Sequence, residues 1–141
     1  MPPIPDDVRA VITSGALAHL VTLNRDGSPQ VTCVWTGIEG DEIVVGHLAW
    51  HLKLKNVSRD ARVAISWETD VDNGIGMKHY LVVHGEARVT EGGAPELLQQ
   101  LARIYVAPDA KFPPMPNPPD GWVMRIKPLR YGGVGPWAAR A

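Results

Sequence analysis

The chain has 141 residues, of which 45% are hydrophobic and 21% charged, and its formal net charge at neutral pH is −1. This length fits one compact domain covering residues 1–141, and the composition is that of an ordinary globular protein. The small net charge excludes the basic field of a non-specific nucleic-acid binder. No apolar run approaches the length that crosses a bilayer, so neither nucleic acid nor membrane is an expected partner.

The N-terminal residues and the cysteine count limit the cellular location and the kinds of site that are expected. The first residues lack the basic and apolar regions of a secretion signal, so a cytoplasmic protein is expected. Cys33 is the only cysteine, which excludes an internal disulfide and any multi-cysteine metal site. No activating base is evident near it in sequence, and we expect a buried, inert thiol.

Hydrophobic periodicity predicts short strands with intervening helices. In chain order the expected elements are a helix that Asp6 caps and Gly15 ends, strands at 16–23, 29–36 and 42–47, a helix at 50–58, strands at 61–69 and 80–90, a helix at 95–105, and a strand at 122–130. Tight turns join the first three strands, which predicts an antiparallel meander. The fold class is therefore mainly β with flanking helices, built on six strands.

Two segments fall outside these elements. Six prolines between Pro108 and Pro119 forbid both helix and central strand, so this stretch is a structured connector or a lid. Residues 131–137 are expected to form a flexible tail, from which Trp137 could reach a planar cofactor or substrate. The other four tryptophans are candidates for core or interface anchors.

Two lysines and a histidine stand at the start of the helix at 50–58. The N-terminus of a helix offers free backbone donors and partial positive charge, so Lys53 and Asn56 on one face would build a phosphate site. The alternative is a solvated basic face, which composition alone favours.

The histidines give weaker signals. His47 and His51 are four residues apart but straddle a strand-to-helix junction, and no third ligand is spaced to complete a metal site, so no metal is expected. His19 is expected to face the barrel interior with a satisfied hydrogen bond. His79 and His84 remain ambiguous.

The order and spacing of several motifs in the sequence are similar to those of a known family. The short strands, the strand opening Gly27-Ser28-Pro29-Gln30, and the spacing Lys53-x-x-Asn56-x-x-x-Asp60-x-Arg62 before another strand are similar to the pyridoxamine-phosphate-oxidase-like split barrels. The likeness is to the actinobacterial branch that uses coenzyme F-420, and it runs from Asp7 to Tyr131. It implies a six-stranded antiparallel split β-barrel.

The resemblance also implies a set of cofactor-binding residues. Lys53 and Asn56 match the phosphate positions, and His51 stands where many relatives carry arginine, a departure that Lys55 is placed to offset. The remaining positions, along the ring system and in cofactor-facing segments, are Gln30, Val31, Thr32, His47, Leu48 and His79.

By the same resemblance, two chains pair through their barrel faces and hold the cofactor at the subunit interface. The expected activity is hydride transfer between reduced F-420 and a small organic acceptor. The protein supplies orientation, and the resemblance identifies no catalytic side chain. One alternative is an FMN-dependent oxidoreductase of the same fold. Another is a non-catalytic protein that carries a planar cofactor.

Overall fold

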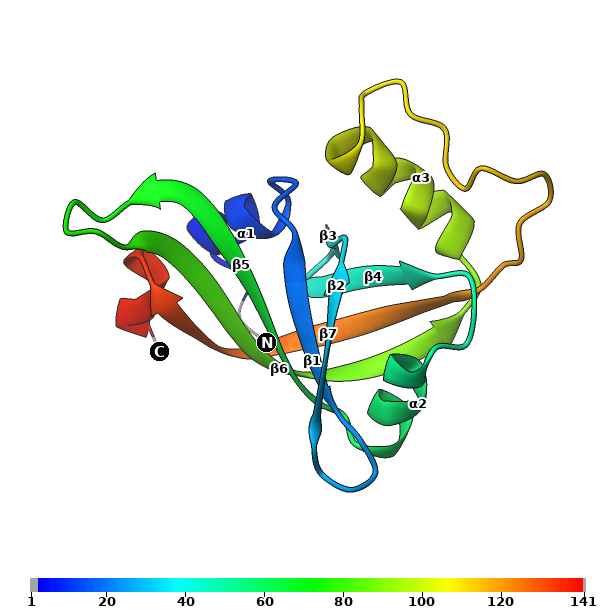
Figure 1. The fold of residues 1–141 in the computed structure, drawn as a ribbon, viewed down its shortest axis with the longest axis horizontal. Helices are drawn as coiled ribbons and strands as arrows, with labels where there is room; N and C mark the ends of the chain where they lie inside the picture. Colours follow the sequence, from blue (N-terminus) through cyan, green and yellow to red (C-terminus); the bar gives the residue numbers. More distant parts are fainter. Residues whose placement is uncertain (1–2, 141) are drawn as a thin grey trace.

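The computed structural model describes the backbone of residues 3–140 and the side chains of residues 3–138. One antiparallel sheet has the strand order β2-β1-β5-β6-β7-β4-β3 and curls into an open barrel (Figure 1). The strands are β1 (Ala18–Leu23), β2 (Pro29–Val34), β3 (Gly37–Glu39), β4 (Glu42–His47), β5 (Arg62–Asp72), β6 (Lys78–Glu91) and β7 (Trp122–Val134). The helices are α1 (Asp6–Ile12), α2 (Leu52–Arg59), α3 (Ala94–Tyr105) and a short 3-10 helix, η1 (Pro136–Arg140).

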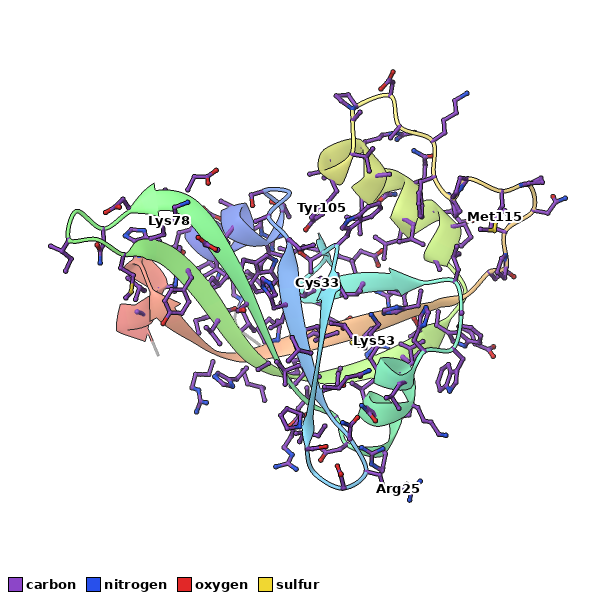
Figure 2. The ribbon with its side chains drawn as sticks, in the orientation of Figure 1. Arg25, Cys33, Lys53, Lys78, Tyr105 and Met115 are labelled. Atoms are coloured by element: carbon purple, nitrogen blue, oxygen red, sulfur yellow. The ribbon has the colours of Figure 1, made fainter. Side chains whose placement is uncertain are left out.

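The proline-rich segment leaves α3 and returns to β7 without helix or strand, as the sequence predicts. Figure 2 shows it running outside the barrel, with Tyr105 at its beginning and Met115 near its outer edge. Gln99 of α3 fixes the segment, because its side-chain amide donates to the carbonyl of Ala110 at 2.8 Å and accepts from the backbone N–H of Phe112 at 3.0 Å. The connector is therefore anchored to α3.

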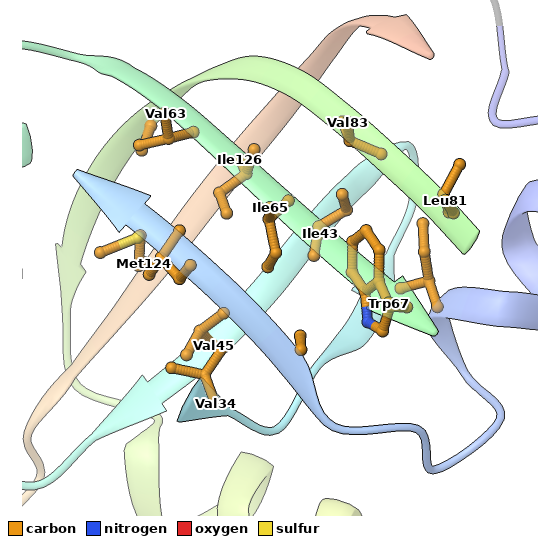
Figure 3. Packing of buried hydrophobic residues seen from close by; sticks show 14 of the residues in the cluster. Val34, Ile43, Val45, Val63, Ile65, Trp67, Leu81, Val83, Met124 and Ile126 are labelled. Atoms are coloured by element: carbon orange, nitrogen blue, oxygen red, sulfur yellow. The ribbon is translucent and has the colours of Figure 1, made fainter. Parts of the chain in front are cut away.

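The main core lies inside the curled sheet. Alternate residues of each strand point inward, as the two-residue period of a strand requires, and Trp67 is the largest of the fully buried side chains (Figure 3). Residues Val44, Leu97, Leu101 and Val123 form a second, smaller cluster under α3. No helix within the described residues is long and apolar enough to cross a membrane.

The predicted meander is wrong, and the sheet has seven strands instead of six. β2 pairs with β1, whereas β4 pairs with β7 and with the short extra strand β3. The reason lies at Thr36, where the chain turns inward after β2 has ended. The Thr36 hydroxyl donates to the carbonyl of Ile12 at 2.9 Å and accepts from the indole N–H of Trp67 at 3.0 Å.

The predicted flexible tail is also wrong. β7 continues to Val134 along β6, and the following 3-10 helix returns Trp137 to the core with 3% of its surface exposed. The Trp137 indole donates to the carbonyl of Tyr80 at 3.1 Å. Burial of so large an aromatic surface explains why this segment is ordered.

Three local expectations need correction. Asp6 lies inside α1, where Pro5 holds the cap position and makes no side-chain cap bond. His19 is exposed instead of barrel-facing, because its neighbours Ala18 and Leu20 occupy the inward positions of β1. Cys33 is exposed instead of buried, for the same reason of strand phase, and it lies opposite His19 on the outer face.

Candidate functional site

A groove opens where β2 and β4 diverge, beside the start of α2. Its volume is about 330 Å³, and its walls come from β2, β4, the connection to α2, helix α3 and the proline-rich segment. The lining residues are Val34, Trp35, Val45, Gly46, His47, Leu48, His51, Lys53, Leu98 and Phe112. The structure thus brings together His47, Leu48, His51 and Lys53, four of the residues predicted from sequence.

Lys53 lines this groove. It reaches from α2 toward β2 (Figure 2), and its Nζ donates to the Thr32 hydroxyl at 3.4 Å. Burial lowers the pKa of Lys53, an effect that the nearby Cys33 opposes. Lys55, two residues along the helix, is exposed and does not line the groove. A half-desolvated ammonium group is suited to an anionic ligand.

His47 is a buried polar residue in the lining of the groove. The inward row of β4 runs through Ile43 and Val45 to His47, which is 5% exposed, and its Nε2 has no hydrogen-bond partner. Burial is the main reason that the pKa of His47 is lowered to about 3, and the charges of Lys53 and His51 contribute to the same shift. The two imidazole rings lie 5.9 Å apart. His47 is therefore a neutral imidazole within a positive environment.

Aromatic side chains form the opposite wall. Trp35 stacks on Tyr105 with ring centroids 5.4 Å apart, and Phe112 meets the Trp35 ring edge-on at 5.3 Å. The Tyr105 hydroxyl donates to the carbonyl of Ala16 at 2.9 Å, which fixes the stack to the start of β1. Because Gln99 also holds the backbone of Phe112, this wall is rigidly supported.

Asn56 does not face the groove, contrary to the sequence prediction. It is fully buried, and its amide nitrogen donates to Thr22 at 3.1 Å, Asn24 at 3.0 Å and Gln30 at 3.3 Å. The three-residue spacing from Lys53 does put both on one side of α2. The shorter side chain, however, ends inside the β1–β2 hairpin, while the longer lysine reaches past it.

The three residues of β2 that the resemblance places along the cofactor ring, Gln30, Val31 and Thr32, do not lie on the same face of the sheet. Gln30 and Thr32 point toward α2, where they bond Asn56 and Lys53 respectively. Val31 lies on the outward face and is 60% exposed. A strand alternates its side chains, so one ligand on one face contacts at most every second side chain of this row.

His79 and Trp137 lie away from the groove, near the C-terminal 3-10 helix, which Figure 1 places far from α2. Their rings meet edge-on at 6.1 Å and line a separate cavity of about 580 Å³ between α1, β5 and the 3-10 helix. Within one chain they therefore cannot contact a ligand held at Lys53.

Sequence reasoning missed the aromatic wall, Leu98 and the glycine of the groove. A Cβ on Gly46 would lie 3.1 Å from Leu98, so glycine lets α3 approach β4 closely. Phe112 is the chain's only phenylalanine and stands within the proline-rich segment, a signal that could have marked it. Among the described residues, no cluster of three or more histidine, cysteine or acidic side chains is arranged to hold a metal.

The comparisons with known proteins agree with this architecture. Residues 4–134 match the model of the pyridoxamine 5'-phosphate oxidase family. An F-420 reductase of known structure is similar with a TM-score of 0.74 at 21% identity, over 92% of this chain and 98% of the other. No curated protein matches the chain.

Two further solved structures share the fold. A conserved hypothetical protein from Mycobacterium tuberculosis is similar with a TM-score of 0.70 at 19% identity, over 98% of this chain and 89% of the other. An FMN-binding protein from Syntrophomonas wolfei is similar with a TM-score of 0.66 at 13% identity, over 90% of this chain and 83% of the other. The split-barrel resemblance is confirmed.

The neutral state of His47 predicts a loss of stability in acid. Because the folded-state pKa lies near 3 and the ordinary value is 6.5, the unfolded chain binds the proton more readily, so stability falls as the pH drops below 6.5 and continues to fall toward 3. Between pH 7 and pH 5 the loss from this residue is about 2 kcal/mol. Urea unfolding at both pH values should show it in the wild-type protein, and His47→Leu should remove it.

The matched control is His19→Leu, which removes an exposed imidazole on β1. This variant should keep the wild-type difference between the two pH values. An equal acid loss in wild type and His47→Leu would contradict the neutral, buried imidazole.

Proposed function

The chain belongs to the pyridoxamine 5'-phosphate oxidase family, and from that membership we propose that it is an F-420-dependent oxidoreductase that transfers a hydride between reduced F-420 and a small organic acceptor. The observation that carries the proposal is the half-buried Lys53 ammonium group at the end of an apolar, aromatic-walled groove. A phosphate-bearing planar cofactor has the two properties that such a groove selects, an anionic group and a flat apolar surface. The solved F-420 reductase of the same fold supports the choice of deazaflavin.

The residues present fit such a cofactor. Lys53 would hold the phosphate, with the Thr32 hydroxyl beside it as a second polar contact. The bound cofactor supplies the hydride chemistry, so the chain need not provide a nucleophile or a metal. The task left to the protein is orientation, and the supported Trp35 and Phe112 wall serves it by limiting where a flat ring can lie and by excluding water.

FMN is the alternative cofactor, since it too carries a phosphate on a planar ring system, and a solved FMN-binding protein shares the fold. The difference is the additional negative charge of the F-420 glutamate tail. His51 and Lys55 are exposed near the start of α2 and would receive it. Lys78 does not belong to this surface. It lies on the β5–β6 hairpin, where its Nζ is 3.8 Å from Oε1 of Glu68 and 4.0 Å from Oδ1 of Asp70.

A homodimer with the cofactor at the subunit interface is the second part of the proposal. The outward face of β2, β1, β5 and β6 carries Val31 opposite Val21 and Val21 opposite Ala64, next to the paired His19 and Cys33. Val31 is 60% exposed and Tyr80 38% exposed in the single chain. Pairing of two chains over this face would remove these apolar side chains from water. A partner could then supply the His79 contact that one chain does not bring to its own groove, whereas Trp137 is buried in the core of its own chain.

The cofactor assignment predicts tighter binding of F-420 than of FMN, with a steeper loss of F-420 affinity as salt rises. Exposed contacts to the glutamate tail are screened, and each contributes less than about 1 kcal/mol. Fluorescence titrations of both cofactors at low and high ionic strength measure this. Tighter FMN binding at every salt concentration would replace the deazaflavin with the flavin. Binding of either cofactor without reduction of any acceptor would favour the carrier function.

Lys53→Ala should weaken cofactor binding by about 2–3 kcal/mol, because a charge-assisted contact in a half-buried site is lost. Lys55→Ala is the matched control on the exposed side of the same helix and should cost less than about 1 kcal/mol. Titration of each variant, with circular dichroism to verify folding, gives the comparison. Equal and negligible effects would place both lysines outside the phosphate site.

The dimer should persist at micromolar concentration, and Val31→Glu should weaken it by about tenfold or more, since an unpaired charge would be buried at the interface. Val106→Glu changes a comparably exposed valine just after α3 and should leave the dimer intact. Sedimentation equilibrium distinguishes the species. A wild-type monomer that binds cofactor with full affinity would refute the shared site.

A further inference from the structure

His47 has a feature that the packing of the chain does not explain. Its side chain is more than nine-tenths buried, yet its Nε2 has no hydrogen-bond partner among the described residues. Buried polar atoms in folded proteins are nearly always paired, because an unpaired one keeps the full cost of leaving water. A partner from outside the chain is the natural remedy, and the His47 side chain lines the groove through which one would enter.

The surroundings of His47 decide which partner fits. On its own strand the inward neighbour is Val45, and the ionisable groups that affect it are Lys53 of α2 and His51 just before that helix. Both lower the pKa of His47, as its burial does, and the ring is therefore neutral. The same positive environment attracts an electron-rich atom of a ligand and repels a cationic one.

We propose that His47 is a specificity-determining contact, whose neutral imidazole donates through Nε2 to a carbonyl oxygen on the ring edge of a planar ligand. This inference rests on the proposed function, since the ligand it describes is the phosphate-bearing cofactor anchored at Lys53. His47 then distinguishes rings with a carbonyl edge from purely hydrocarbon rings, while the aromatic wall accepts either. In this arrangement Lys53 binds the phosphate and His47 contacts the edge of the ring.

The placement of His47 makes the contact directional. The residue ends the inward row of β4, so its backbone is held in the ladder with β7, opposite Trp122. Across that junction Gly121 packs so closely that an added Cβ would overlap the His47 carbonyl. A backbone fixed in this way limits the positions from which the imidazole can offer a hydrogen bond.

The test compares His47→Leu with His47→Gln. Glutamine can place an amide N–H near the position of Nε2, whereas leucine keeps similar volume without a donor. FMN and F-420 are titrated separately into wild type and both variants, and unfolding by urea at pH 7 gives the stability of each ligand-free protein. Leucine should weaken binding of the cofactor about tenfold, glutamine less than about threefold, and the leucine variant should be at least as stable as wild type.

A second measurement observes the contact itself. In protein labelled with nitrogen-15 at histidine, the Nε2 resonance of His47 should shift when cofactor is added and should retain the pattern of a neutral ring. An unchanged resonance at saturation would overturn the inference. So would unaltered affinity in His47→Leu, or equal losses of stability and affinity in both variants, which would indicate a structural role alone.

These outcomes separate the inference from the function on which it rests. If wild type binds neither FMN nor F-420, the proposed function fails and this contact fails with it. If wild type binds either cofactor and Lys53→Ala weakens binding, but His47→Leu does not, the function stands and only the role of His47 is refuted.

Discussion

Helix α2 is held to the β1–β2 hairpin by the side-chain amide of Asn56, which lies inside the protein and donates to Thr22, Asn24 and Gln30. A helix of eight residues is not stable alone and takes its position from such tertiary contacts. The amide oxygen also accepts from Arg59, which in turn donates to the carbonyl of Leu23. The direction of Lys53 across β2, and with it the geometry of the groove, follows from this anchored position.

The groove itself exists because the barrel is not closed by hydrogen bonds between β2 and β4. Thr36 draws the chain inward after β2, and the hairpin that follows, β3–β4, joins the sheet on the far side through β7. Val34 and Val45, which both line the groove, therefore belong to strands that no ladder joins. The groove thus lies where strand pairing is interrupted, and clefts of this kind are where proteins commonly bind small ligands.

Local patterns predicted much of this fold, and long-range pairing decided the rest. β4 has the predicted bounds, and α3 differs by one residue, because alternation and helical spacing are properties of neighbouring residues. The partners of β4 depend on a residue, Thr36, whose buried bonds join segments far apart in sequence. For His19 the error was the phase of an alternating strand, since the residues on both sides of it, Ala18 and Leu20, are apolar.

The lining of the groove was predictable where one stretch of chain supplies it, and not where the fold assembles it from distant segments. His47, Leu48, His51 and Lys53 are close in sequence and lie together. The aromatic wall comes from Trp35, Tyr105 and Phe112, which only the packing of α3 brings together. Two unfavourable features meet in this groove, the desolvated Lys53 ammonium and the unpaired His47 Nε2. An anionic ligand with a carbonyl edge would relieve both at once, so the chain gives up stability at the positions where binding can recover it.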